Sequence, residues 1–250
     1  MQFTPKIQTA SGLMTKRIIN GQEATNGAYP WAVFLKVSHG SVNYCGATVI
    51  ADRWLLTAAH CFWPTDKQDS VQPTTGILHF DADWIFTHPN YRPGMNINDI
   101  ALLKIRGKFP LDQNRVSQVE LPLDSVVVRW PTLYTSCILV GWGCTKANGP
   151  VSNKARILEM RVLQSQACSE MYDGSFVMDS RFQLCAGYYM SDTSACQGDS
   201  GGGLICNLRG KSTIGGVLSA GHPNQTKSYP MLFSRTSAYT SWVQDVMAKS

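Results

Sequence analysis

The 250-residue sequence has no uninterrupted run of 18 apolar residues and no pair of cysteines with the Cys-x-x-Cys spacing. The first absence leaves no candidate for a membrane-spanning helix, and the second removes the usual signature of a zinc module. The eight cysteines therefore predict disulfides, which form in oxidising compartments. We expect a secreted, extracellular protein without a membrane partner.

Acidic residues are absent from residues 1–17, a segment that holds Lys6, Lys16 and Arg17. The whole chain has a net charge of +5, but removing these three from the 22 basic residues leaves 19 against 17 acidic ones, or +2. A net charge of +2 does not indicate the basic surface of a nucleic-acid-binding protein, so we expect no nucleic-acid partner. The segment also lacks the apolar core of a signal peptide, so we expect no signal peptide in this chain.

The most distinctive stretch of the sequence is 196–202, which is CQGDSGG. Glycines on both sides of Ser200 allow positive φ angles and the close approach of another main chain, so its hydroxyl is expected on a tight, open corner. The N–H groups of Gly198 and Ser200 can then point into one small space where an oxygen develops negative charge. The plainer alternative is a glycine-rich turn with a solvated serine.

Two further segments supply partners for this serine. His60 ends the apolar run LLTAAHC at 55–61, and Asp99 stands at the head of NDIALL at 98–103. Taken singly, such residues are usually a core histidine and a cap. Together with the serine they are a nucleophile, a base and an orienting carboxylate. Their order along the chain differs from that of the α/β-hydrolases, where serine comes first, and of the subtilisins, where aspartate comes first.

Five short motifs, in this order, resemble those of the chymotrypsin/trypsin family of serine proteases from about residue 18 to the C-terminus. They are RIING at 17–21, TAAHC at 57–61, DIALL at 99–103, GWG at 141–143 and GDSGG at 198–202. The resemblance implies a serine endopeptidase that hydrolyses peptide bonds through an acyl-enzyme. The implied catalytic residues are His60, Asp99 and Ser200, and Gly198 and Ser200 form the implied oxyanion hole.

Short segments rich in β-branched and aromatic residues, with Gly, Pro or Asn between them, predict an all-β fold. The expected strands are 31–37, 45–57, 83–87, 100–105, 137–141, 156–163, 213–219 and 231–236. The resemblance implies two six-stranded antiparallel β-barrels, at about 31–110 and 132–236, with a linker at about 111–131 and the active site in the cleft between the barrels. Apolar residues at helical spacing predict a C-terminal helix at about 237–248.

Residues 1–17 are polar and aperiodic, which by itself indicates a disordered tail. The resemblance instead implies an activation peptide, cut after Arg17 so that a new N-terminus at Ile18 pairs with Asp199. Because removing one partner of a buried ion pair costs roughly 3–5 kcal/mol, such a pair can switch a loop between two states. We therefore expect a nearly inactive zymogen, an external trypsin-like activating protease, and release of the peptide, which has no cysteine.

The substrate pocket implied by the resemblance departs from the trypsin pattern. Ser194 stands where trypsin-like enzymes carry Asp, so burying a substrate Lys or Arg would be costly; Asp192 is the alternative counter-charge. Met231 replaces a wall glycine, and we expect a preference for small or medium apolar side chains before the scissile bond. Ser219 matches a family residue that supports the buried aspartate, the alternative being an ordinary strand serine. The other expected substrate-binding residues are Ala195, Gln197, Ala220 and Gly221.

The resemblance implies three disulfides, Cys45–Cys61, Cys137–Cys206 and Cys168–Cys185. The family's fourth bridge ties the cysteine before the nucleophile to a partner that is missing from 222–228 in this chain. An extra cysteine, Cys144, follows the GWG motif instead. We hypothesise a Cys144–Cys196 bridge, and the alternative is two free thiols.

Three calls remain, on glycosylation, metals and partners. Asn224 begins an Asn-Gln-Thr sequon and is an expected glycosylation site. No metal or other cofactor is expected: where some relatives carry a calcium loop, the acids are Asp66 and Asp69, too few for six to eight oxygen ligands. Expected partners are protein or peptide substrates, the activating protease and a protein inhibitor, and we expect a monomer. The competing hypothesis is a catalytically weak or silent homologue that acts as a binding or decoy protein.

Overall fold

The computed structural model describes the chain in twelve ranges: 21–39, 41–62, 71–75, 78–79, 81–94, 96–112, 115–122, 129–146, 149–172, 178–187, 194–221 and 229–250. Several residues of the sequence predictions lie outside these ranges: Arg17, Ile18, Asp66, Asp69, Asp192 and Asn224. The expectations for the activation cleavage, the calcium loop, the alternative counter-charge and glycosylation therefore stay predictions.

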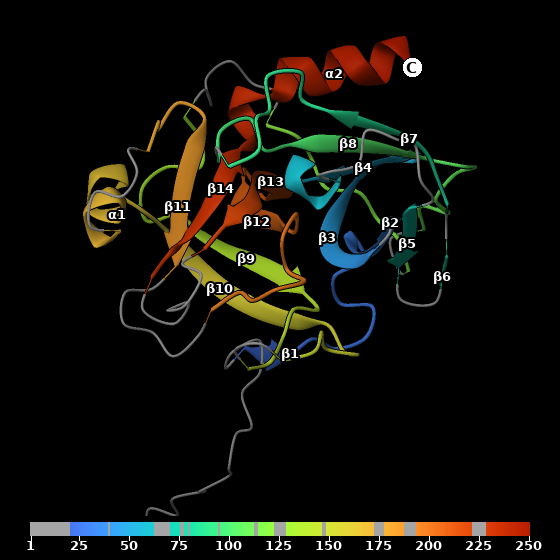
Figure 1. Cartoon of the computed structure of the whole chain (residues 1–250), viewed down its shortest axis with the longest axis horizontal. Helices are drawn as coiled ribbons and strands as arrows, with labels where there is room; N and C mark the ends of the chain where they lie inside the picture. Colours follow the sequence, from blue (N-terminus) through green and yellow to red (C-terminus); the bar gives the residue numbers. More distant parts are fainter. Residues whose placement is uncertain are drawn as a thin grey trace, which may run out of the picture.

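The N-terminal half forms one antiparallel sheet with the strand order β6–β5–β2–β3–β4–β8–β7 (Figure 1). Its strands are β2 (Ala32–His39), β3 (Ser41–Ala51), β4 (Trp54–Thr57), β5 (Val71–Thr75), β6 (Leu78–His79), β7 (Ala82–Thr87) and β8 (Ala101–Ile105). The expectation of a single strand over 45–57 was wrong. The chain turns at Asp52 and Arg53, so that β4 pairs back onto β3.

The strands of the C-terminal half follow the order β10–β11–β14–β13–β12–β9. Besides its neighbour β11, the first strand β10 also pairs with the last strand β9, so the sheet closes into a six-stranded barrel. Its strands are β9 (Ser136–Gly141), β10 (Arg156–Leu163), β11 (Gln183–Gly187), β12 (Gly203–Leu208), β13 (Lys211–Ala220) and β14 (Met231–Arg235). The short strand β1 (Gln22–Glu23) joins β10. The sequence analysis missed β11 and β12. All five residues of β11 are buried, so its sequence carries no alternation of polar and apolar residues.

The structure has two large apolar cores, one centred on each half of the chain. Leu35, Leu55 and Leu102 are among the fully buried side chains of the first core, and Leu139 and Phe233 belong to the second. Complete burial of one such side chain stabilises the fold by about 1.5–3 kcal/mol. The first core also includes Ile205 from β12 and Ile214 and Val217 from β13, so the two halves pack against each other.

Two helices follow strands of the second barrel. The helix α1 (Ser165–Met171) was not expected, whereas α2 (Thr240–Lys249) begins three residues after and ends one residue after the expected C-terminal helix at about 237–248. A 3-10 turn at Thr236–Ala238 precedes α2, and Val243 packs into the core of the first half. The C-terminus of the chain is therefore fastened to the N-terminal sheet (Figure 1). Within the described ranges, no helix has the length and apolar character needed to cross a membrane.

Four disulfides tie the chain together, and no cysteine is free. They join Cys45 to Cys61, Cys137 to Cys206, Cys144 to Cys196, and Cys168 to Cys185. These are the four pairs expected from the sequence, including the bridge that the hypothesis placed between Cys144 and Cys196.

Candidate active site

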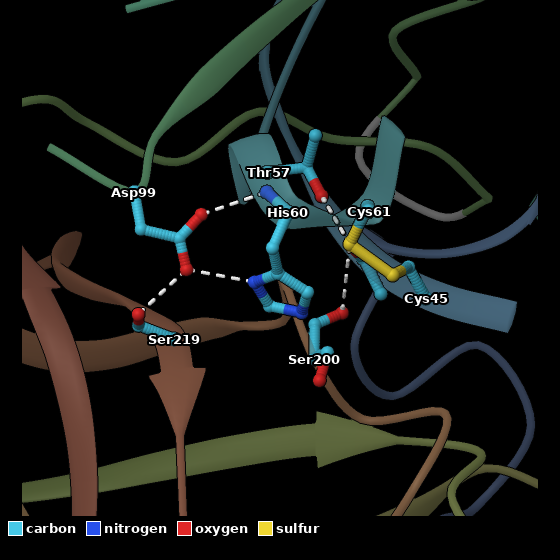
Figure 2. The surroundings of a disulfide bond; sticks show 8 residues. Cys45, Thr57, His60, Cys61, Asp99, Ser200 and Ser219 are labelled. Atoms are coloured by element: carbon cyan, nitrogen blue, oxygen red, sulfur yellow. Dashed lines mark hydrogen bonds and ion pairs between the residues drawn. A yellow bond between two sulfur atoms is a disulfide. The ribbon is translucent and has the colours of Figure 1, made fainter. Parts of the chain in front are cut away.

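His60 and Asp99 meet because the strands beside them are neighbours. His60 lies in the 3-10 turn Ala59–Phe62, just after β4, and Asp99 lies just before β8. The two strands are paired, with Thr57 opposite Ala101. Residues that are 39 positions apart are thereby brought into contact at one end of the sheet (Figure 2).

The Asp99 carboxylate is buried and accepts three hydrogen bonds. Its Oδ2 atom lies 2.7 Å from His60 Nδ1 and accepts the Ser219 hydroxyl at 2.6 Å, while Oδ1 accepts the His60 backbone N–H at 2.8 Å. Because an ionised carboxylate can only accept, the proton of the neutral imidazole sits on Nδ1 and leaves Nε2 with a free lone pair. Nε2 is therefore available as a base, on a side chain that is 31% exposed.

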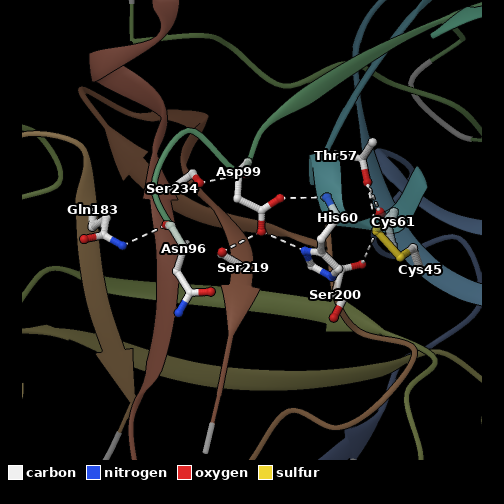
Figure 3. Close-up of polar contacts among 11 residues, drawn as sticks. Cys45, Thr57, His60, Cys61, Asn96, Asp99, Gln183, Ser200, Ser219 and Ser234 are labelled. Carbon is white, nitrogen blue, oxygen red and sulfur yellow. Dashed lines mark hydrogen bonds and ion pairs between the residues drawn. A yellow bond between two sulfur atoms is a disulfide. The ribbon is translucent and has the colours of Figure 1, made fainter. Parts of the chain in front are cut away.

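The loop that presents Asp99 is held from the C-terminal half of the chain. Ser234 donates a hydrogen bond to the Asp99 carbonyl at 2.7 Å (Figure 3). The hydroxyl of Tyr239 accepts the Asn98 N–H at 3.1 Å, where Asn98 has a φ of 57°, a conformation that asparagine adopts more readily than most residues. Gln183 donates to the carbonyl of Asn96 at 2.8 Å. The sequence analysis missed these three supports, because nothing local distinguishes them from ordinary strand or helix-end residues.

Ser200 sits on a corner that both halves of the chain hold in place. Its carbonyl accepts the Gly46 N–H at 2.7 Å, and the Gly201 N–H donates to the Leu218 carbonyl at 2.8 Å. Gly201 has a φ of +80°, and a Cβ there would lie 2.2 Å from Thr57 Oγ1, so only glycine fits. The expectation of a tight corner that another main chain approaches closely therefore matches the geometry at this glycine.

The Ser200 side chain lies beside the imidazole of His60 (Figures 2 and 3). None of the hydrogen bonds between described residues joins Ser200 Oγ to His60 Nε2. In enzymes without bound substrate, hydrogen bonds between catalytic groups are often long and tighten only when the substrate arrives. The nucleophile and the base are therefore adjacent, and we expect their hydrogen bond to form when substrate binds.

The backbone before Ser200 leaves two donors open. The backbone hydrogen bonds between described residues include no partner for the N–H of Gly198 or of Ser200. The carbonyl of Gln197 points elsewhere, since it accepts the Cys144 N–H at 2.9 Å. The two residues expected to form an oxyanion hole therefore both have N–H groups that can serve an incoming oxygen.

Asp199 is completely buried, and burial raises the pKa of its carboxyl from 3.8 to about 6. Two backbone donors act in the opposite direction: Gly143 N–H to Oδ1 at 2.7 Å and Cys196 N–H to Oδ2 at 2.9 Å. None of the ion pairs within the described part of the chain includes this carboxylate. The carboxyl therefore sits in a site that disfavours its charge.

The two glycines of the GWG motif make room for this carboxylate. A Cβ on Gly141 would lie 2.0 Å from Asp199 Oδ1, and one on Gly143 would lie 2.1 Å from Oδ2. Non-bonded atoms do not approach this closely, so a side chain at either glycine would displace the Asp199 carboxylate. The sequence analysis used these glycines only as a family motif and did not foresee this role.

Met231, which we expect in the substrate pocket, is buried next to Gly221. It is 3% exposed, and a Cβ on Gly221 would lie 2.8 Å from the Met231 sulfur, so the thioether lies directly against the backbone of Gly221. Ser194, at the expected pocket floor, is 1% exposed and donates its hydroxyl to the carbonyl of Ala195 at 3.0 Å. A small cavity touches both Ser194 and Met231 but has neither Gly221 nor Ala195 in its lining.

One group of side chains among the described residues has the spacing of metal ligands: His60 with Cys45 and Cys61. The two sulfurs are joined to each other in a disulfide, so neither is a thiolate that can bind a metal. The donor set does not fit a metal centre.

A histidine between a buried carboxylate and a serine, beside two open backbone donors, defines the site of a serine hydrolase. The family model described as Trypsin matches residues 18–243. A curated protein described as "Trypsin", from Squalus acanthias, is 28% identical over 237 residues, which are 93% of this chain and 96% of that protein. The chain belongs to the trypsin family of serine proteases, and it is a serine endopeptidase.

Proposed function

We propose that the chain is a secreted protease zymogen whose mature form, cut after Arg17, cleaves peptide bonds after small or medium apolar side chains. The observation that carries the catalytic assignment is the network on Asp99 Oδ2, where His60 Nδ1 and the Ser219 hydroxyl lie at 2.7 and 2.6 Å. This network leaves Nε2 of His60 free, and Ser200 lies next to it on a backbone corner that hydrogen bonds hold in place. Four disulfides support secretion, since such bonds persist in oxidising compartments.

In this proposal Ser200 Oγ attacks the scissile carbonyl while His60 Nε2 takes its proton. The imidazolium that forms is stabilised by Asp99 through the contact at Nδ1, and it then returns the proton to the leaving amine. A water molecule then attacks the acyl-enzyme in the same way, with His60 taking its proton and returning it to Ser200. The N–H groups of Gly198 and Ser200 receive the charged oxygen, and losing one such donor typically lowers kcat by about 10²–10³.

The surroundings of Asp199 support activation by cleavage. A fully buried carboxyl with a pKa of about 6 lacks a counter-charge in the described part of the chain. A new α-amino group at Ile18 would supply that charge and would stabilise the loop that leads to Ser200, where the Cys196 N–H already donates to the same carboxylate. The uncut chain has no such amine, and we therefore expect it to be nearly inactive.

The position of Met231 supports the substrate preference. Its thioether takes up space against Gly221, so a large aromatic side chain would meet it, whereas a small or medium apolar side chain would contact it without overlap. A lysine or arginine side chain would be buried beside Ser194, which carries no charge to offset the loss of solvation. These contacts favour apolar over basic residues at the scissile bond.

The proposal is tested on the purified chain after cleavage at Arg17 by an added trypsin-like protease, which is then removed. We expect a serine-directed phosphonate to label the cut protein and to leave both the uncut protein and the cut S200A variant unlabelled. A peptide library read by mass spectrometry reports the side chain before each cleaved bond. The binding or decoy alternative predicts no labelling and no cleavage, and a preference for lysine, arginine or tryptophan would refute the pocket assignment.

A further inference from the structure

The Cys144–Cys196 disulfide lies next to the site but has no part in the mechanism above. It joins residues 52 positions apart, one directly after the GWG motif and one in the loop that leads to the nucleophile. Cys144 is fully buried and Cys196 is half-buried, so one end of the bridge lies in the packed interior. It fastens the loop after β9 to the loop before Ser200.

A hydrogen bond beside the bridge sets the direction of one peptide group. The Cys144 N–H donates to the carbonyl of Gln197 at 2.9 Å. In a planar trans peptide the carbonyl and the following N–H point in opposite directions. The N–H of Gly198 is therefore aimed away from Cys144, and it is one of the two donors assigned to the oxyanion hole. If this peptide rotated, an acceptor would replace that donor in the hole.

The same loop supports Gly198 from a second side. Gly198 has a φ of +97°, and a Cβ there would lie 2.7 Å from Val151 Cγ1 and 3.3 Å from the Cα of Gly143. The backbone of Gly198 is thus packed directly on Gly143, the residue before Cys144, and on Val151, further along the same segment. Separation of the two loops would remove both the hydrogen bond to Gln197 and this support.

We propose that the Cys144–Cys196 disulfide is a positioning device for the oxyanion hole. By keeping the Cys144 N–H on the Gln197 carbonyl, the crosslink holds the Gly198 N–H in its donating orientation. The proposal rests on the proposed acyl transfer at Ser200. Since the donor serves the charged oxygen of the tetrahedral intermediate more than the ground-state substrate, losing the crosslink lowers kcat and leaves KM nearly unchanged.

The kinetic test uses the activated protein and the variant C144S/C196S, with C144A/C196A as a second pair if serine at buried position 144 prevents folding. We expect kcat to fall at least tenfold and by no more than the 10²–10³ of a lost donor, with KM changed less than threefold. The matched control is C168S/C185S, which removes the bridge between α1 and β11 and should retain kcat within about twofold. A folded 144/196 variant with an unchanged kcat, or equal losses in both variants, would overturn the proposal.

A spectroscopic readout separates this proposal from the catalytic assignment. Gln197–Gly198 is the only Gln-Gly pair in the sequence, so ¹³C-carbonyl glutamine with ¹⁵N-glycine gives one assigned amide signal. We expect the Gly198 amide signal to shift or broaden in the 144/196 variant and to stay in place in the control. An unmoved signal overturns the positioning role even if the enzyme is active. A wild-type protein that neither cleaves peptides nor reacts with phosphonate overturns the proposed function, whatever this signal does.

Discussion

The buried carboxyl of Asp199 predicts that cleavage after Arg17 changes how stability depends on pH. In the uncut chain the folded-state pKa of this group is about 6, against an ordinary value of 3.8. A group whose pKa is raised by folding binds more protons in the folded state, so it lowers stability as the pH rises between the two values. At 1.36 kcal/mol per pKa unit, this group alone removes about 2–3 kcal/mol between pH 4 and pH 7, because the unfolded carboxyl is already partly ionised at pH 4.

Cleavage should reverse this behaviour. An amine at Ile18 paired with the carboxylate holds the pKa of Asp199 low, so the loss of stability between pH 4 and pH 7 disappears while the amine stays protonated. We expect the groups shared by the two forms to contribute equally to both, and the new amine stays protonated up to pH 7. The difference in unfolding free energy, cut minus uncut, should therefore increase by about 2–3 kcal/mol across this pH range.

The measurement is urea unfolding of both forms at pH 4, 5, 6 and 7. Both proteins carry S200A, which prevents self-digestion without changing the environment of the carboxyl. The D199N variant is the control, and its cut and uncut forms should show a pH-independent difference. A wild-type difference that stays flat across the range would refute the assignment of Asp199 as the partner of the new amine.

Three substitutions test other parts of the site. S219A removes the 2.6 Å hydrogen bond to Asp99, and we expect an approximately tenfold lower kcat, because a hydrogen bond to a charged group is worth about 1.5–3 kcal/mol. G143A would place a Cβ 2.1 Å from Asp199 Oδ2, and we expect loss of phosphonate labelling after activation. M231G empties the space against Gly221, and kcat/KM for substrates with phenylalanine before the scissile bond should rise relative to alanine.

S219A and G143A each have a control variant, and each of the three substitutions has a contradicting result. S212A changes an exposed serine of the same strand and should leave kcat intact; equal losses in both variants would contradict the role given to Ser219. G210A is the control for G143A. A Cβ at position 210 would have open space around it, although the φ of +83° at Gly210 makes a modest loss of stability expected. Labelling of activated G143A at the wild-type rate would show that the carboxylate tolerates a side chain there. An unchanged phenylalanine-to-alanine ratio in M231G would remove Met231 from the pocket.

Much of the site could be predicted from the sequence, because its parts have distinctive local requirements. A serine between glycines needs a special backbone, and Gly201 indeed has a positive φ with no room for a side chain. The order of histidine, aspartate and serine along the chain pointed to one family, whose model matches residues 18–243. Strands in which buried and exposed residues alternate clearly, such as β10, could also be predicted, since this alternation can be read from the strand's own sequence.

Other features depend on residues that are distant in sequence, and no local pattern contains them. The turn at Asp52 that divides 45–57 is visible only through the pairing of β4 with β3, and β11 is buried on both faces. Ser234 and Tyr239 became supports of the Asp99 loop because the C-terminal half packs against it.

The sequence by itself determined the chemistry, since residue types and their glycine neighbours decide which groups can act as nucleophile, base and donor. Only the tertiary structure decided how those groups are held. The burial of Asp199 against Gly143, the thioether of Met231 against Gly221, and the peptide of Gln197 turned by Cys144 all arise from contacts between separate segments. Burial and hydrogen-bond direction are properties of such contacts, and they exist only once the chain has folded.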